Sequence, residues 1–152
     1  MQTFPVSSSH LSAAHLAKYL SSPYPFLENN DCIFIKPGIN DTYVVSIKNE
    51  KYIFRVYNYN WHSKLEIEEE LRFLNLLKDK GLSISFPIKD KHKEYIQTFA
   101  APEGERYGVL FSFAKGAKKP VVSTTTHFKI GAFIGRLHDN AQNLALKRII
   151  YN

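Results

Sequence analysis

The chain has 152 residues, of which 44% are hydrophobic and 14% aromatic, and it carries a formal net charge of +6. This composition indicates one packed globular domain rather than a disordered chain, and no apolar run approaches the ~20 residues of a membrane span. The lone Cys32 excludes an internal disulfide, and the N-terminus lacks the features of a secretory signal, so we expect a cytoplasmic protein without a membrane partner.

The positive charge would suit nucleic acid, phosphate or an anionic surface. The lysines are dispersed, however, with only small groups in residues 89–93 and 115–119. Solvated loops explain such groups better than a binding patch does. A basic nucleic-acid-binding domain is therefore the weakest of the alternatives, and nucleic acid is not an expected partner.

The N-terminal part of the chain predicts a helix, a strand and a sharp turn. The serines at 7–9 are expected to cap the helix, which the prolines around 23–25 end. Residues 32–35 read as a first strand. The turn follows at 37–42, where Gly38 permits backbone angles that side chains forbid.

Two β-branched and aromatic runs, 43–47 and 52–57, predict the next two strands. By the two-residue alternation of a strand, Arg55 shares a face with Ile53 and Tyr57, which cover part of its stem. A partly buried guanidinium group requires a charged partner or a ligand anion.

A helix over 61–80 is the clearest element in the sequence, and Gly81 ends it. Glu70 lies three, four and seven residues before apolar positions of the helix and leans toward its core stripe, whereas Glu68 and Glu69 point outward and are expected to be solvated. Glu70 is thus a candidate partner for Arg55. An edge-strand arginine beside a solvated acidic helix remains the alternative. The core stripe consists of Ile67, Leu71, Leu74 and Leu77.

Further strands are predicted at 95–99 and 107–111, and the short connections favour antiparallel neighbours. A polar linker over 112–120 leads to a last helix, whose apolar arc is wider than one small sheet needs, which suggests a missing partner surface. The predicted class is α+β: a five-stranded, mainly antiparallel sheet with a helix between strands 3 and 4, an N-terminal helix and a C-terminal helix. The arc comprises Ile130, Phe133, Ile134, Leu137, Ala141 and Leu144.

Five segments in order, 38–43, 52–57, 70–74, 101–107 and 131–138, resemble the aminoglycoside phosphotransferase and type II homoserine kinase-like family, which has a protein-kinase-like fold. The resemblance implies a kinase-like N-lobe over 1–111, a hinge over 112–120 and the start of a C-lobe over 121–152.

The same resemblance implies ATP as the cofactor, with Arg55 in the role of the phosphate-holding base and Glu70 as its partner. An arginine in place of the usual kinase lysine still supplies the positive charge. The implied nucleotide-binding residues are Gly38, Asn40 and Thr42 around the loop over the phosphates, Arg55 and Glu70 in the pair, and Ser112, Phe113 and Ala114 facing the adenine.

The family's H-x-D-x-x-x-x-N-like catalytic loop and its metal-binding aspartate are not found, because His138-Asp139 has the wrong spacing. No catalytic or metal-binding residue is therefore assigned, Mg is expected only with a missing lobe, and the six histidines show no metal-ligand spacing. We expect the nucleotide-binding lobe of an ATP-dependent small-molecule phosphotransferase, truncated and inactive alone. The alternative is a non-catalytic interaction module that pairs, or self-associates, through its apolar C-terminal helix.

Overall fold

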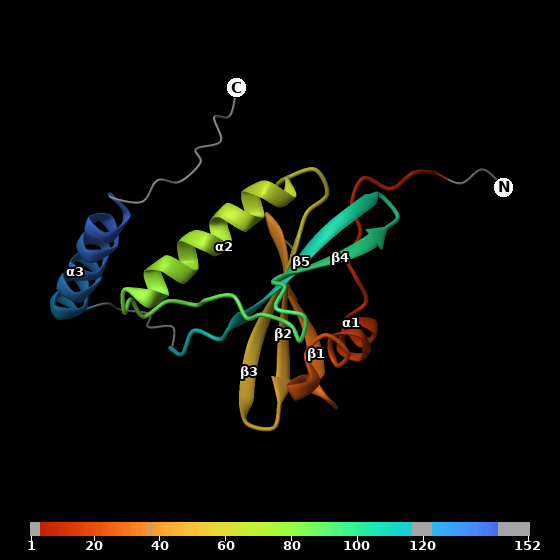
Figure 1. The fold of residues 1–152 in the computed structure, drawn as a ribbon, viewed down its shortest axis with the longest axis horizontal. Coiled ribbons are helices and arrows are strands. Elements are labelled where there is room, and N and C mark those ends of the chain that lie inside the picture. Colours follow the sequence, from red (N-terminus) through yellow and green to blue (C-terminus); the bar gives the residue numbers. More distant parts are fainter. Residues whose placement is uncertain (1–3, 37, 117–122, 143–152) are drawn as a thin grey trace.

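The computed structural model describes residues 4–36, 38–116 and 123–142. Three α-helices, one short 3-10 turn and five strands succeed one another along the chain (Figure 1). In chain order these are α1 (Ala13–Leu20), η1 (Pro25–Leu27), β1 (Asp31–Lys36), β2 (Asn40–Ile47), β3 (Glu50–Tyr57), α2 (Lys64–Asp79), β4 (Ile96–Ala101), β5 (Gly104–Ser112) and α3 (Thr124–Ala141).

The five strands form one sheet in the order β1-β2-β3-β5-β4, and every neighbouring pair is antiparallel. This confirms the predicted fold class, which is that of a kinase-like small lobe. After α2 a bridge between Pro87 and Phe111 ties the chain to the end of β5, on the side of β5 away from β3. The chain then enters β4 at the outer edge, so β5 returns beside β3.

The two faces of the sheet are covered by different helices, α1 on one side and α2 on the other (Figure 1). This follows from the alternation of side chains along each strand. The α1 face contains a cluster of buried residues that includes Leu16, Leu20, Tyr43, Val45, Phe54, Val56 and Leu110. The α2 face contains Tyr57, Ile67, Leu71, Val109 and Phe111.

Both helix starts differ from the prediction, the first because of a contact with a distant segment and the second because of a local cap. The first helix begins after Ser12 and not after the serines at 7–9, since Ser9 instead bonds the carboxylate of Glu103. The second begins after Ser63 and not at Trp61: Ser63 and Glu66 form a reciprocal capping box.

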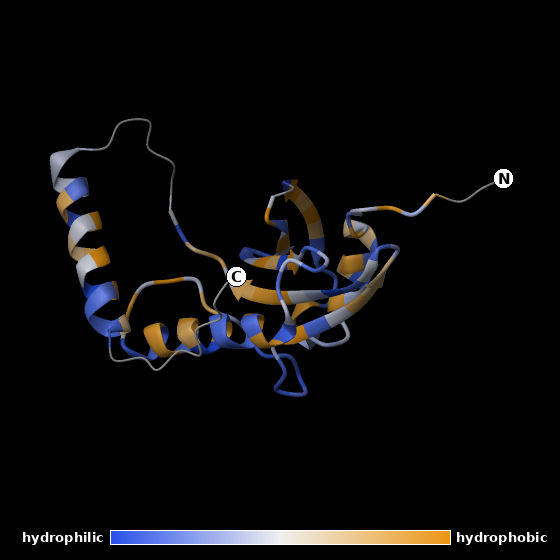
Figure 2. Ribbon diagram, turned by 90° about the horizontal axis from the view of Figure 1, so that it is seen from above, coloured by the Kyte–Doolittle hydropathy of each residue, from blue (hydrophilic) through white to orange (hydrophobic). Residues whose placement is uncertain are grey.

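The last helix, α3, lies apart from the sheet, beside the C-terminal end of α2 (Figure 1). No described residue of α3 is fully buried, and Phe128, Ile130 and Ile134 are exposed, so much of the hydrophobic surface of this helix, seen as bands in Figure 2, is uncovered. Leu144, the linker part 117–120 and the terminal part 143–152 lie outside the described residues. None of the helices described is both long enough and apolar enough for a membrane crossing.

Candidate functional site

Arg55 on β3 and Glu70 on α2 form the expected ion pair, with Nη1 of Arg55 donating to Oε1 of Glu70 at 2.8 Å. The two side chains remain 33% and 37% exposed. Arg55 is also steadied from β5, because its guanidinium carbon lies 4.8 Å from the ring centroid of Phe111. The cation is therefore fixed in direction but still open to a ligand.

The other oxygen of the Glu70 carboxylate is also occupied. The hydroxyl of Tyr57, a residue that is 1% exposed, donates to Oε2 of Glu70 at 2.8 Å. Burial and the charge of Glu70 raise the pKa of the Tyr57 hydroxyl far above its ordinary value, so this group stays protonated and remains a donor. The Glu70 carboxylate thus accepts a hydrogen bond from each of two β3 side chains, Arg55 and Tyr57, and so ties α2 to β3.

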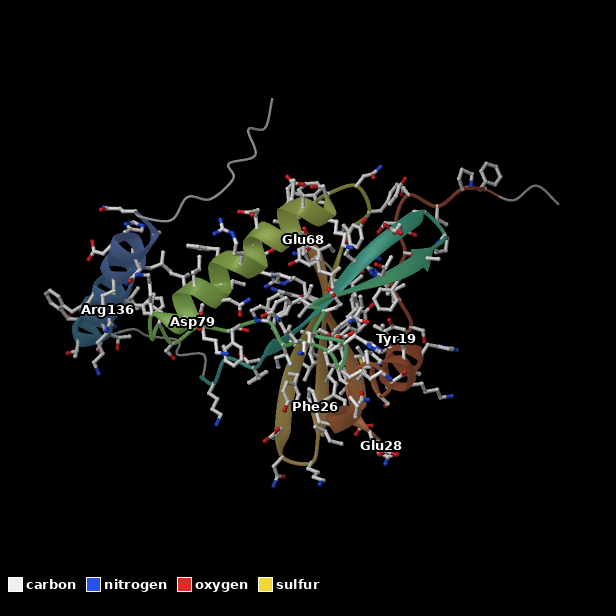
Figure 3. All side chains as sticks on the ribbon, viewed as in Figure 1. Tyr19, Phe26, Glu28, Glu68, Asp79 and Arg136 are labelled. Atoms are coloured by element: carbon white, nitrogen blue, oxygen red, sulfur yellow. The ribbon has the colours of Figure 1, made fainter. Side chains whose placement is uncertain are left out.

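The neighbouring acids of α2 behave differently from Glu70. Glu68 is exposed, as expected, and Figure 3 shows it in the N-terminal half of the helix. The expectation that Glu69 is solvated is wrong: its side chain is 19% exposed and pairs with Arg72 at 2.9 Å. The arginine three residues further along the same helix draws Glu69 onto the helix surface.

The strand register places an apolar row next to the Arg55 cation on the same face of the sheet. Ile33, Val44, Ile53 and Phe111 lie opposite one another across β1, β2, β3 and β5. Ile33 is 58% exposed, so the β1 end of this row is uncovered. A flat aromatic ring could pack on this row. It would then lie two residues along the strand, roughly 7 Å, from the row that contains Arg55.

The glycine turn lies at the same end of the sheet as Tyr57. Gly38 is exposed, and its carbonyl oxygen accepts a hydrogen bond from Nδ2 of Asn58 at 2.9 Å. Asn40 begins β2 opposite Tyr57, and its buried Oδ1 has no hydrogen-bond partner among the described residues. Thr42 lies directly opposite Arg55 in the register. The structure therefore brings Gly38, Asn40 and Thr42 close to the ion pair.

The expected hinge residues divide into two groups. Ser112 is still part of β5, and its backbone N–H and C=O are bonded to Phe86 and to the hydroxyl of Ser85. Phe113 and Ala114 follow the strand and are exposed. A nucleobase beside this segment would therefore hydrogen-bond the backbone groups of Phe113 and Ala114, because those of Ser112 are already bonded.

A buried arginine on the opposite face of the sheet was not expected from the sequence. The side chain of Arg106 is fully buried, and Nη2 donates to Oδ2 of Asp41 at 2.8 Å. The preceding residues 102–105 have a turn-rich sequence, and no local pattern there separates a buried arginine from a solvated one. Its further partners are the backbone oxygens of Tyr57 (3.0 Å) and Ser9 (2.6 Å), Oδ1 of Asn58 (3.0 Å) and the carboxylate of Glu103 (3.5 Å).

The charge of Arg106 is matched by more than one carboxylate. Burial alone would raise the pKa of Glu103, but hydrogen bonds from Ser9 and the charge of Arg106 outweigh it and hold that pKa below its ordinary value. Asp41 accepts from Arg106 and also contacts the ring Nδ1 of His10 at 3.0 Å. The N-terminal segment is thereby tied to the start of β2 and to the β4–β5 turn.

The remaining candidate groups have structural surroundings. Cys32 is half-buried against the α1 core, and burial raises its pKa to about 11, so its thiol is neutral and acts as a small apolar group. His138 lies in the last turn of α3. Among the described residues, no group of three or more His, Cys, Asp or Glu side chains could hold a metal ion.

No family model matches the chain. An uncharacterized protein of Synechocystis sp. is 31% identical over 140 residues, which are 91% of this chain and 39% of that protein. An uncharacterized protein of Deinococcus radiodurans is 30% identical over 115 residues, 76% of this chain and 33% of that protein. The chain thus spans well under half the length of these relatives.

Solved structures with the same fold are kinases of small molecules. A microcompartment-associated aminopropanol kinase superposes with a TM-score of 0.73 at 20% identity, over 91% of this chain and 45% of that one. An amicoumacin kinase in complex with AMP-PNP, Ca²⁺ and Ami has a TM-score of 0.72 at 18% identity, over 89% of this chain and 41% of that one. A spectinomycin phosphotransferase with ADP and spectinomycin has a TM-score of 0.57 at 19% identity, over 75% of this chain and 34% of that one. The chain therefore has a kinase-like fold.

Proposed function

We propose that this chain is the nucleotide-binding lobe of an ATP-dependent small-molecule phosphotransferase of the aminoglycoside phosphotransferase type. The observation that carries the proposal is the Arg55 guanidinium group, which Glu70 holds at 2.8 Å while a third of its side chain stays exposed. A fixed, open cation next to a glycine turn is suited to the phosphates of a nucleotide. The kinase-like fold supports the same assignment.

The residues present could hold ATP at its two ends. The apolar row that begins at Ile33 would take the adenine, with the backbone of Phe113 and Ala114 beside its edge. Arg55 and the turn at Gly38 would take the phosphates. In this arrangement Asn40 and Thr42 line the path from the sheet to the turn, and Ser112 anchors the strand that leads to the adenine edge.

The chemical step needs groups beyond these residues. Phosphoryl transfer depends on a base for the acceptor hydroxyl and on a metal ion that neutralises the developing charge. The sequence contains no loop with the family's spacing for that base, so we expect the 152 residues alone to bind ATP without transferring its phosphate. In a longer protein, a second lobe would supply both the site for a small-molecule acceptor and the Mg site.

Isothermal titration of the chain with Mg·ATP tests the proposal. Arg55→Ala should raise the Kd by about tenfold or more, since a hydrogen bond to a charged group contributes roughly 1.5–3 kcal/mol, whereas Arg55→Lys should retain most of the affinity. ADP should compete and adenosine should compete weakly, because the phosphates carry the contact. An unchanged Kd for Mg·ATP in Arg55→Ala would show that Arg55 does not bind the phosphates.

The exposed apolar residues of α3 favour a second candidate, a non-catalytic module that pairs with another surface, including a second copy, through Ile130 and Ile134, which lie four residues apart on one face of the helix. This candidate does not require nucleotide. The same titration separates the two, since the module predicts no saturable heat with Mg·ATP.

A further inference from the structure

Two adjacent residues at the end of β3 contact both halves of the proposed phosphate site. The hydroxyl of Tyr57 donates to Glu70 at 2.8 Å, and the side-chain amide of Asn58 donates to the carbonyl oxygen of Gly38 at 2.9 Å. One short stretch of backbone thereby joins α2, which orients Arg55 through Glu70, to the glycine turn.

The same two residues are held from the other face of the sheet by a rigid group. Nε of Arg106 donates to the backbone oxygen of Tyr57 at 3.0 Å, and Nη2 donates to Oδ1 of Asn58 at 3.0 Å. The guanidinium group is planar, its donors point in fixed directions, and it is fully buried and paired with Asp41. The position of Tyr57 and Asn58 is therefore determined independently of any ligand.

We propose that Tyr57 and Asn58 are positioning residues that set the spacing between the glycine turn and the Arg55–Glu70 pair, so that the phosphates of one nucleotide meet both. This inference rests on the proposed function. Neither residue has to touch the nucleotide, and Tyr57 is too deeply buried to do so. Their contribution is preorganisation: the turn and the cation are held in place before binding, which lowers the entropic cost of binding.

The hydrogen bonds that carry the inference end on two groups of the site, the Glu70 carboxylate and the carbonyl oxygen of Gly38. Without the Tyr57 hydroxyl, one oxygen of Glu70 loses its buried partner and the carboxylate is free to rotate away from Arg55. Without the Asn58 amide, the exposed backbone at Gly38 loses its link to β3. The two losses affect different parts of the same site.

The variants Tyr57→Phe and Asn58→Ala test the inference, and each has a matched control. Tyr52→Phe removes a tyrosine–carboxylate hydrogen bond at the far end of β3, where Tyr52 donates to Glu50. Asn140→Ala removes an amide-to-carbonyl bond in α3, from Asn140 to Arg136. Two readouts are compared in the 152-residue chain: hydrogen exchange without nucleotide, and the Kd for Mg·ATP.

We expect Tyr57→Phe to speed exchange of the Arg55 guanidinium protons, and Asn58→Ala to speed exchange of the backbone amides at Gly38 and Ile39. Each variant should raise the Kd for Mg·ATP by about two- to tenfold, the size of one lost hydrogen bond, while both controls leave exchange and Kd unchanged.

Failure of the inference and failure of the proposed function are distinguishable. If the unaltered chain binds Mg·ATP and both variants bind equally well, the inference is wrong and the proposed function stands. The same conclusion holds if exchange rises and affinity does not. If the unaltered chain does not bind Mg·ATP, the proposed function is wrong, and unchanged exchange in the variants would overturn the positioning role as well.

Discussion

Replacing Arg106 by leucine should destabilise the chain by about 3–5 kcal/mol, the usual cost of removing one partner of a buried ion pair. The carboxylate of Asp41 would remain buried without its cation, and Glu103 would lose the positive charge that helps to lower its pKa. The backbone oxygen of Tyr57 would also lose its donor. The free energy of unfolding from urea titrations, followed by circular dichroism, measures this loss.

A partly exposed ion pair provides the control. The side chain of Arg72 is 43% exposed and lies 2.9 Å from Glu69 on the surface of α2, so water screens this arginine, whereas Arg106 is fully buried. Arg72→Ala should therefore leave the urea midpoint almost unchanged. Equal losses of unfolding free energy in Arg106→Leu and Arg72→Ala would contradict the claim that the buried Arg106 network stabilises this end of the sheet.

Replacing Glu70 by glutamine should weaken Mg·ATP binding by about tenfold, although Glu70 itself does not touch the nucleotide. The reason is that Arg55 loses the charged partner that fixes it, and a hydrogen bond between charged groups contributes roughly 1.5–3 kcal/mol. In the Arg55→Ala background the same substitution should have little further effect, because the cation that it positions is absent.

Glu68→Gln is the control for this experiment, since Glu68 is exposed on the same helix and carries the same charge (Figure 3). It should leave the Kd unchanged. If the losses of Mg·ATP affinity from Arg55→Ala and Glu70→Gln add up in the double variant, the two residues act separately. If Glu68→Gln lowers the affinity as much as Glu70→Gln does, the effect comes from the net charge of the helix and not from the Arg55–Glu70 pair.

The elements and the ion pair could be predicted because their signals are local. β-branched runs indicated β2 and β3, the apolar periodicity indicated α2, and the alternation along β3 placed Arg55 on the face of Ile53 and Tyr57. Glu70 was identified by its spacing from the apolar stripe. The capping box that begins α2 was missed, because the prediction placed the helix start at residue 61, although Ser63 and Glu66 have the required spacing.

Other features depend on contacts between distant segments and left no local signal. The insertion of β5 between β3 and β4 is determined by its pairing with β3, from which α2 and β4 separate it in the sequence. Arg106 is buried because Ser9, Asp41 and Asn58 converge on it from three parts of the chain. The position of the helix α1 also depended on this network, since Ser9 is used there and not as a cap.

The most direct measurement of the central claim is an NMR titration of the isotope-labelled chain with Mg·ATP. The account predicts saturable shifts of the Arg55 guanidinium resonance, of the amides of residues 38–42 and of those of Phe113 and Ala114, with adenosine reproducing only the last of these. Saturable shifts confined to other surfaces, or an Arg55 resonance that does not move while ATP binds, would contradict it.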